Sequence, residues 1–83
     1  MKLRTDGVTW QEIDGELVIL DMQTSAYLTT NVAGAVLAKL LVQDREQQEL
    51  SDALIAEFGI DRDTADRDAA VFVDQLREKG LLA

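Results

Sequence analysis

The chain has 83 residues, and its 16 acidic and 8 basic side chains give a net charge of −8 at neutral pH. Cysteine and histidine are both absent, which excludes a disulfide framework, a thiol nucleophile, a Cys/His zinc site and an imidazole base. A chain this short supports one modest core, so we expect a single domain over residues 1–83. It has no signal-peptide pattern and no apolar run of the roughly 20 residues that a membrane span needs, which predicts a cytoplasmic protein.

A β-hairpin is predicted near the N-terminus. Asp14 and Gly15 suit a two-residue type I′ turn, in which both residues adopt a positive φ. Residues 8–13 and 16–21 then pair as antiparallel strands. In this register one face collects four large apolar residues and is the candidate core face: Val8, Trp10, Leu17 and Ile19. The second strand is also apolar on its other side, which predicts a sheet that is partly covered on both faces.

A third strand is expected over residues 26–30, after a turn at residues 22–25. With this turn, Leu28 joins the core face and Tyr27 lies beside Leu20 on the opposite face. Because the strand is the last of the meander, its outer edge has no partner. Open strand edges are liabilities unless something covers them, so this edge is a candidate for a functional role.

Two helices with apolar residues at helical spacing are predicted next. The first opens at the N-cap residue Asn31 and runs to about residue 43. Gly34 in its first turn costs helix stability, which predicts a close backbone approach at this position. The second helix covers about residues 46–58 and ends at Gly59.

A third helix is expected from about Asp61 to just before Gly80, with aspartates near its start and basic residues near its end. Val71 lies off its apolar stripe and therefore either covers a loop or lines a groove. The core residues of this helix are predicted to be Ala65, Ala69, Phe72 and Leu76. Together the elements predict an α+β fold, in which a three-stranded antiparallel meander is followed by three helices as in a winged helix-turn-helix.

The acidic stretches of the chain do not suit a metal or catalytic site. A calcium loop requires alternating oxygen donors, a central glycine and a final bidentate glutamate, and DRDTADRD over residues 61–68 has neither the glycine nor the glutamate. These aspartates are typical of a solvated helix start. Glycine-rich phosphate loops and serine nucleophile motifs are also absent. The sequence therefore predicts a protein that is not an enzyme and that needs no cofactor and no metal.

A winged helix-turn-helix also raises the alternative of a small DNA-binding regulator. The candidate recognition helix, however, begins with four aspartates and only two arginines, whereas the contacts that dominate DNA affinity need cations. The net charge also repels phosphate backbones and anionic lipid surfaces. We therefore expect neither a nucleic acid nor a membrane as a partner.

Four motifs follow one another over about residues 8 to 82. They are W-x-E-x-DGELVILD, YL-x-x-N-x-x-G-x-x-L, EL-x-x-x-L-x-x-x-F-G-I and D-x-x-x-FV-x-x-L-x-x-x-G-LL. In this order and spacing they resemble the PqqD-like family, the recognition elements for ribosomally synthesised precursor peptides. The segments DGELVILD and TSAYLTTNVAGAVLAKLL are most similar to the free-standing lasso-peptide B proteins, which bind the leader of a precursor and deliver it to a separate leader peptidase.

The resemblance implies a peptide site between the third strand and the third helix. The leader would lie antiparallel against the third strand by strand addition. The backbone groups would come from Ala26, Tyr27, Leu28, Thr29 and Thr30. The side chains that form or flank the cleft would be Leu20, Tyr27, Asp68, Val71, Phe72 and Gln75. Asp68 matches an aspartate of the family, although support of the helix start explains it equally well, and Phe72 fits the core better than a contact.

The resemblance also implies which molecules bind. Lasso leaders commonly present a tyrosine, a proline and a leucine, so the site would accept an aromatic and small apolar groups. The expected partners are a precursor leader peptide and a separate leader peptidase, and we expect a monomer. Three alternatives remain open, namely a peptide chaperone for a radical-SAM enzyme in the pyrroloquinoline quinone pathway, a DNA-binding regulator, and a structural subunit whose open edge pairs with a second copy.

Overall fold

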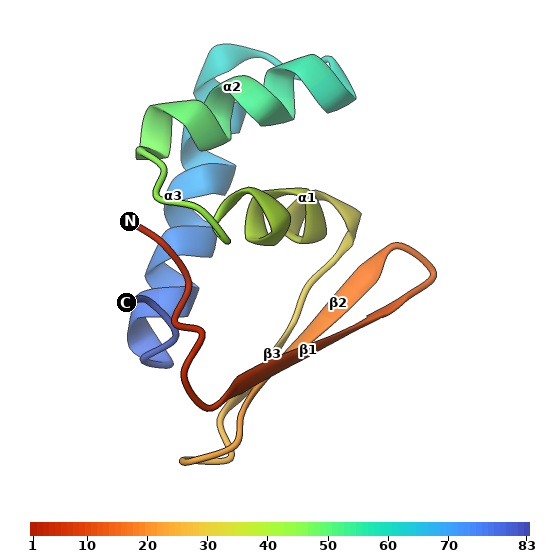
Figure 1. Cartoon of the computed structure of the whole chain (residues 1–83). Coiled ribbons are helices and arrows are strands. Elements are labelled where there is room, and N and C mark those ends of the chain that lie inside the picture. Colours follow the sequence, from red (N-terminus) through yellow and green to blue (C-terminus); the bar gives the residue numbers. More distant parts are fainter.

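The computed structural model describes residues 1–83 and shows three strands followed by three helices (Figure 1). The strands are β1 (Val8–Ile13), β2 (Glu16–Asp21) and β3 (Tyr27–Thr29). The helices are α1 (Val32–Leu40), α2 (Gln47–Phe58) and α3 (Arg62–Glu78). The α+β class and the order of the elements are confirmed. None of the three helices combines the length and the apolar surface that crossing a bilayer requires.

The β1–β2 hairpin has the predicted turn and register. Asp14 and Gly15 both adopt positive φ angles, 53° and 81°, as a type I′ turn requires. The turn brings Trp10 opposite Ile19, and the sheet has the order β1-β2-β3 with antiparallel pairing throughout. Leu28 of β3 lies on the other side of Ile19. The predicted core face of the sheet is therefore correct.

The helices cover only one face of this sheet, and the opposite face is open (Figure 1). Ile19, on the covered face, is completely buried, whereas its neighbour Leu20 points away from the helices and stays exposed. The prediction of a sheet partly covered on both faces is wrong. The reason is that the link after β3 returns the chain to the covered face, and each later helix packs onto the core that forms there.

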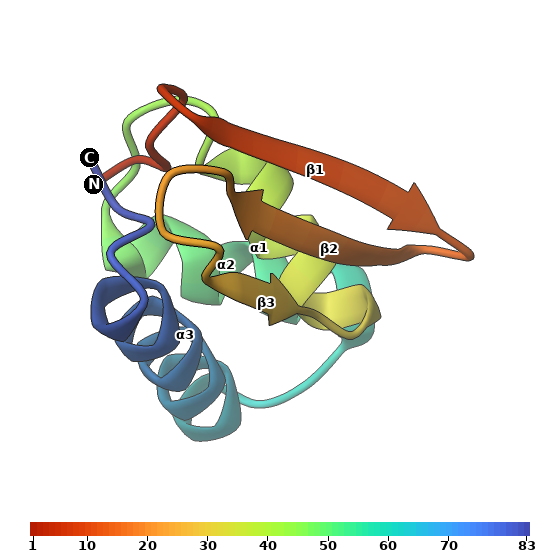
Figure 2. The same cartoon turned by 90° about the horizontal axis from the view of Figure 1, so that it is seen from below.

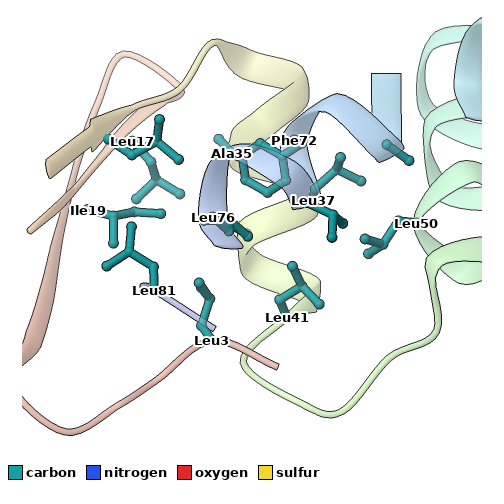
Figure 3. Packing of buried hydrophobic residues seen from close by; sticks show 14 of the residues in the cluster. Leu3, Leu17, Ile19, Ala35, Leu37, Leu41, Leu50, Phe72, Leu76 and Leu81 are labelled. Carbon is teal, nitrogen blue, oxygen red and sulfur yellow. The ribbon is translucent and has the colours of Figure 1, made fainter. Parts of the chain in front are cut away.

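The core is a single cluster of 16 buried apolar residues between the sheet and the helices (Figure 3). Leu17 of β2, Leu37 of α1 and Leu76 of α3 meet there. Both ends of the chain contribute as well, because Leu3 and Leu81 are buried and Leu3 forms a β-bridge with Leu82. This contribution was not predicted, since neither terminal segment has the length or periodicity of a strand or helix.

The helix boundaries follow their capping residues. The Oδ1 atom of Asn31 accepts a hydrogen bond from the Gly34 N–H at 2.8 Å, which caps α1 as predicted. Gly59 ends α2 in the left-handed conformation, with a φ of 64°. The first helix ends at Leu40 rather than near residue 43, because the chain turns at Leu41 and buries this side chain in the core.

Candidate functional site

The outer edge of β3 carries unpaired backbone groups. The Asp21 N–H donates to the Ala26 carbonyl and the Thr30 N–H donates to the Leu17 carbonyl, both at 2.8 Å. Hydrogen-bonding direction alternates along an antiparallel strand, so residues 26, 28 and 30 face β2. The N–H and C=O groups of Tyr27 and Thr29 therefore point to the open side. Of the five residues predicted to supply backbone groups, these two are positioned to do so, whereas the other three serve the existing ladder.

A cleft with a volume of about 330 Å³ opens between α1 and α3, at the point where β3 ends. In the view of Figure 2, α3 passes on the side of the sheet that β3 borders, so the open edge and this cleft adjoin. Half of the lining residues are apolar. The cleft is lined by Asn31, Ala33, Gly34, Leu37, Leu54, Arg67, Asp68, Val71, Phe72 and Gln75.

Gly34 joins the end of β3 to the wall of the cleft. A Cβ atom at this position would lie 2.8 Å from the Thr30 Cβ and 3.2 Å from the Phe72 Cε1, both too close for an ordinary contact. The absence of a side chain therefore allows β3, α1 and α3 to meet, which confirms the close approach predicted at this glycine. Thr30 is itself fixed, since its Oγ1 accepts the Leu17 N–H at 3.1 Å.

Four of the predicted side chains, Asp68, Val71, Phe72 and Gln75, come together along one face of α3 and line the cleft. Val71 is 51% exposed and lines the cleft. Of its two predicted roles, covering a loop or lining a groove, the second is therefore correct. Phe72 is only 6% exposed and belongs to the core, and its remaining surface forms part of the cleft wall.

Leu20 and Tyr27 are not among the residues that line this cleft. They pair across β2 and β3 and point to the open face of the sheet, away from the helices. Side chains alternate between the two faces of a strand. Because Leu28 points into the core, its neighbour Tyr27 points to the opposite face. Tyr27 thus contributes its backbone to the edge and its side chain to the opposite face.

Six lining residues were not predicted: Asn31, Ala33, Gly34, Leu37, Leu54 and Arg67. Of the four residues in α1 and at its cap, Asn31 is predicted as the cap and Gly34 as a point of close backbone approach. Nothing in a single sequence shows how α1 packs against α3, so their shared surface could not be found. The i, i+4 and i+8 spacing of Arg67, Val71 and Gln75 was a usable signal, because it places all three on one side of α3.

The turn between β2 and β3 is held by a buried carboxylate. Asp21 is 2% exposed and accepts hydrogen bonds from the Gln23 N–H at 2.9 Å and from the Arg4 guanidinium. The Gln23 N–H and the Arg4 side chain hold the pKa of Asp21 below its ordinary value, against the opposing effect of burial. Arg4 also donates its backbone N–H to the Leu81 carbonyl at 2.9 Å. This network connects the β2–β3 turn to the chain that leaves α3.

The second open edge of the sheet, along β1, differs from the edge of β3. The Met22 N–H donates to the Gly7 carbonyl, so by alternation Val8, Trp10 and Glu12 have their backbone groups on the open side. No β1 residue lines the cleft. Beneath this edge Glu12 pairs with Lys39 at 2.7 Å, and charged side chains are a common protection of strand edges.

The structure contains no group of three or more His, Cys, Asp or Glu side chains that could hold a metal ion. The cleft has one cationic and one acidic side chain, Arg67 and Asp68, and the rest of its lining is uncharged and mostly apolar. Such a surface is suited to binding apolar side chains. Fold and site together define a small winged-helix-like α+β domain in which an open strand edge adjoins a partly apolar cleft.

The chain belongs to the PqqD family, since the family model described as coenzyme PQQ synthesis protein D matches residues 16–82. The predicted resemblance is thereby confirmed. The comparison with curated proteins gives no match.

Two solved structures share the fold over nearly the whole chain. The first is TbiB1 in complex with the TbiA(beta) leader peptide. The similarity covers 99% of this chain and 94% of the TbiB1 chain, with 36% sequence identity and a TM-score of 0.86. The second is a lasso peptide synthetase B1 complexed with the leader peptide, with 26% identity, coverages of 96% and 93%, and a TM-score of 0.80.

Proposed function

We propose that this chain binds the leader segment of a ribosomally synthesised precursor peptide and delivers it to a leader peptidase in lasso-peptide biosynthesis. The observation that carries the proposal is the position of the outward backbone groups of Tyr27 and Thr29 beside the partly apolar cleft. Both similar solved proteins are complexes with leader peptides, which supports the same type of ligand here.

The leader adds to the sheet as a fourth, antiparallel strand. One leader residue pairs with Thr29, the next lies opposite Leu28, and the third pairs with Tyr27. The first and third exchange backbone hydrogen bonds with β3 and place their side chains on the open face of the sheet. The middle residue points toward α3, as do others at alternate positions, and these side chains enter the cleft. The leader is thus recognised on both faces of the added strand.

The cleft supplies most of the binding free energy. Each backbone hydrogen bond contributes a net of about 0.5–1.5 kcal/mol, and the short edge of β3 offers only a few of them. Ordering a flexible leader costs about 2–5 kcal/mol. Apolar side chains seated against Val71 and Phe72 must therefore provide the remainder, since burying one such side chain contributes about 1.5–3 kcal/mol.

The protein itself acts as a monomeric adaptor without catalytic residues, built as one domain over residues 1–83. The chemistry of leader removal belongs to the separate peptidase. The chain's task is to hold the leader in an extended conformation, which raises the effective concentration of the cleavage site when the peptidase binds the same complex.

Two of the three alternatives, the DNA-binding regulator and the self-pairing subunit, fit the structure less well. In α3, Arg62 is occupied by ion pairs with Asp52 at 2.9 Å and Asp66 at 3.7 Å, so this arginine is not free to contact a phosphate. Pairing of two copies through an open strand edge would use the edge but not the adjoining cleft. A chaperone that hands its peptide to a radical-SAM enzyme uses the same edge and cleft, and differs only in the enzyme that receives the peptide.

Titration of a fluorescein-labelled leader peptide, taken from the precursor encoded in the same gene cluster, tests the proposal. We expect saturable binding by fluorescence anisotropy, no binding to a labelled 20-base-pair duplex, and a monomer by light scattering. Binding of the duplex without the peptide would support the regulator instead. A concentration-dependent dimer that excludes the peptide would support self-pairing. Cleavage assays with the clustered peptidase then distinguish delivery to a peptidase from delivery to a radical-SAM enzyme.

A further inference from the structure

The open face of the sheet differs in composition from the rest of the surface. Charged residues make up 29% of the chain, but Glu16 is the only charged residue among the strand residues that point to this face. Glu16 lies at the hairpin end. Local depletion of charge, combined with exposed aromatic and methionine side chains, is the composition of protein–protein interfaces rather than of ordinary solvated surfaces.

Three exposed apolar side chains of this face lie together at the end formed by the β2–β3 turn, whereas Ile13, which is 54% exposed, lies at the hairpin end beside Glu16. Tyr27 and Leu20 are direct neighbours across the two strands, and Met22 begins the turn beside them. Tyr27 and Met22 are each 61% exposed, and Leu20 is 36% exposed. We call these three residues the exit patch, because of their position relative to the peptide.

The direction of the added strand gives the exit patch its position. A strand that is antiparallel to β3 begins beside Thr29 and leaves beside Tyr27. The part of the precursor that follows the leader therefore passes the β2–β3 turn, where Met22 lies. An enzyme that cleaves downstream of the leader must approach this end of the sheet.

We propose that the exit patch docks the leader peptidase, an inference that rests on the proposed function. The patch is continuous with the peptide site, because the leader residue that pairs with Tyr27 places its side chain on the same face. Peptide binding therefore enlarges the surface available to the peptidase. The peptidase binds the peptide-loaded protein more tightly than the free protein, which couples recruitment of the enzyme to the presence of its substrate.

The test uses the full chain, the labelled leader and the peptidase encoded in the same cluster. Met22→Asp places a charge in the patch, at a turn residue that lies outside β3 and does not line the cleft. Val42→Asp makes the same change in charge at a side chain that is 45% exposed but lies beyond α1, outside the sheet. Met22→Gln removes apolar surface without adding charge. Leader affinity is measured by anisotropy, and peptidase affinity is measured by interferometry on the loaded complex.

We expect Met22→Asp to weaken peptidase binding at least tenfold and Met22→Gln to weaken it several-fold, while Val42→Asp matches the wild type. Leader affinity stays within twofold in all three variants. Wild-type peptidase affinity in both Met22 variants, or no peptidase binding by a wild-type protein that binds leader, would overturn the inference. So would a wild-type dimer that Met22→Asp dissociates, since the patch would then join two copies. Failure of the wild type to bind leader would instead overturn the proposed function itself.

Discussion

Gly34 in α1 lies directly against the ring of Phe72 in α3. A Cβ atom on Gly34 would lie 3.2 Å from the Phe72 Cε1, and it would also lie 2.8 Å from the Cβ of Thr30. The three residues belong to the segments that border the proposed peptide site. Their contact therefore sets how far the end of β3 stands from α3.

Gly34→Ala tests this contact. In an exposed helix the change would add about 1 kcal/mol of stability. Here it inserts a methyl group into a filled space, which typically costs about 1–3 kcal/mol. We expect a net loss of stability in urea unfolding and a weaker affinity for the leader, because α3 must move away from β3. A more stable variant with unchanged affinity would show that the neighbouring side chains yield easily. Ala56→Gly, at an exposed position of α2, is a control for helix propensity alone.

Much of the fold was predictable because its determinants are local. Asp14 and Gly15 define the hairpin turn, and the turn defines which residues of β1 and β2 share a face. Asn31 and Gly59 define helix ends through hydrogen bonding and backbone conformation that a short window of sequence reveals. The same reasoning placed Leu28 correctly in the core, because a strand alternates its side chains strictly.

The site was less predictable because it depends on contacts between distant segments. The cleft side chains of α3 were implied by the resemblance to the family, and helical spacing alone indicated only Val71. The facing residues Ala33 and Leu37 depend on how α1 packs against α3. Leu20 was assigned to the cleft by resemblance although its alternation places it on the open face. The burial of Leu3 in the core was not predicted, since a single β-bridge to Leu82 leaves no periodic pattern in the sequence.

Thr29→Pro tests strand addition at β3. Proline removes the outward N–H of Thr29 and places its ring where the added strand would lie, without breaking a hydrogen bond to β2. We expect at least a tenfold loss of leader affinity, about 1.4 kcal/mol, measured by anisotropy. Thr29→Ala keeps the N–H and should bind nearly as well as the wild type.

Glu12→Pro provides the matched control at the other edge of the sheet. Glu12 has its N–H on the open side of β1, so the same substitution there blocks the other edge. Leader affinity should be unchanged. If Glu12→Pro abolished binding and Thr29→Pro did not, the peptide would add to β1 instead. Circular dichroism of both variants must match the wild type for either result to count.

Val71→Asp tests the cleft independently of the edge. Val71 is half exposed, so the variant should fold normally, but a carboxylate in the cleft must lose water when an apolar leader side chain enters. We expect a loss of 1 kcal/mol or more, roughly fivefold or greater, with little change in thermal stability. Val42→Asp, an equally exposed valine outside the cleft, should bind the leader normally. Equal affinities of these two variants would mean that the cleft does not receive the peptide.

Asp21→Asn tests the network that supports the β2–β3 turn. The Gln23 N–H and Arg4 hold the pKa of Asp21 below its ordinary value of 3.8. Because the carboxyl group binds its proton less readily in the folded state, the ionised form contributes stability that is complete above this ordinary pKa and is lost as pH falls through the lower folded value. The variant should therefore be less stable than the wild type at pH 7. Urea unfolding from pH 7 to pH 2 should show this difference shrinking below about pH 4.

Glu57→Gln serves as the control for that pH series, because it removes an exposed carboxylate that forms no ion pair. Its stability should follow the wild-type curve at every pH. Leader affinity of Asp21→Asn at pH 7 should also fall, since the turn that Asp21 holds leads directly into β3. A constant stability difference across the whole pH range would mean that Asp21 acts through packing rather than through its charge. The ion pair between Arg4 and Asp21 would then contribute nothing to stability through electrostatics.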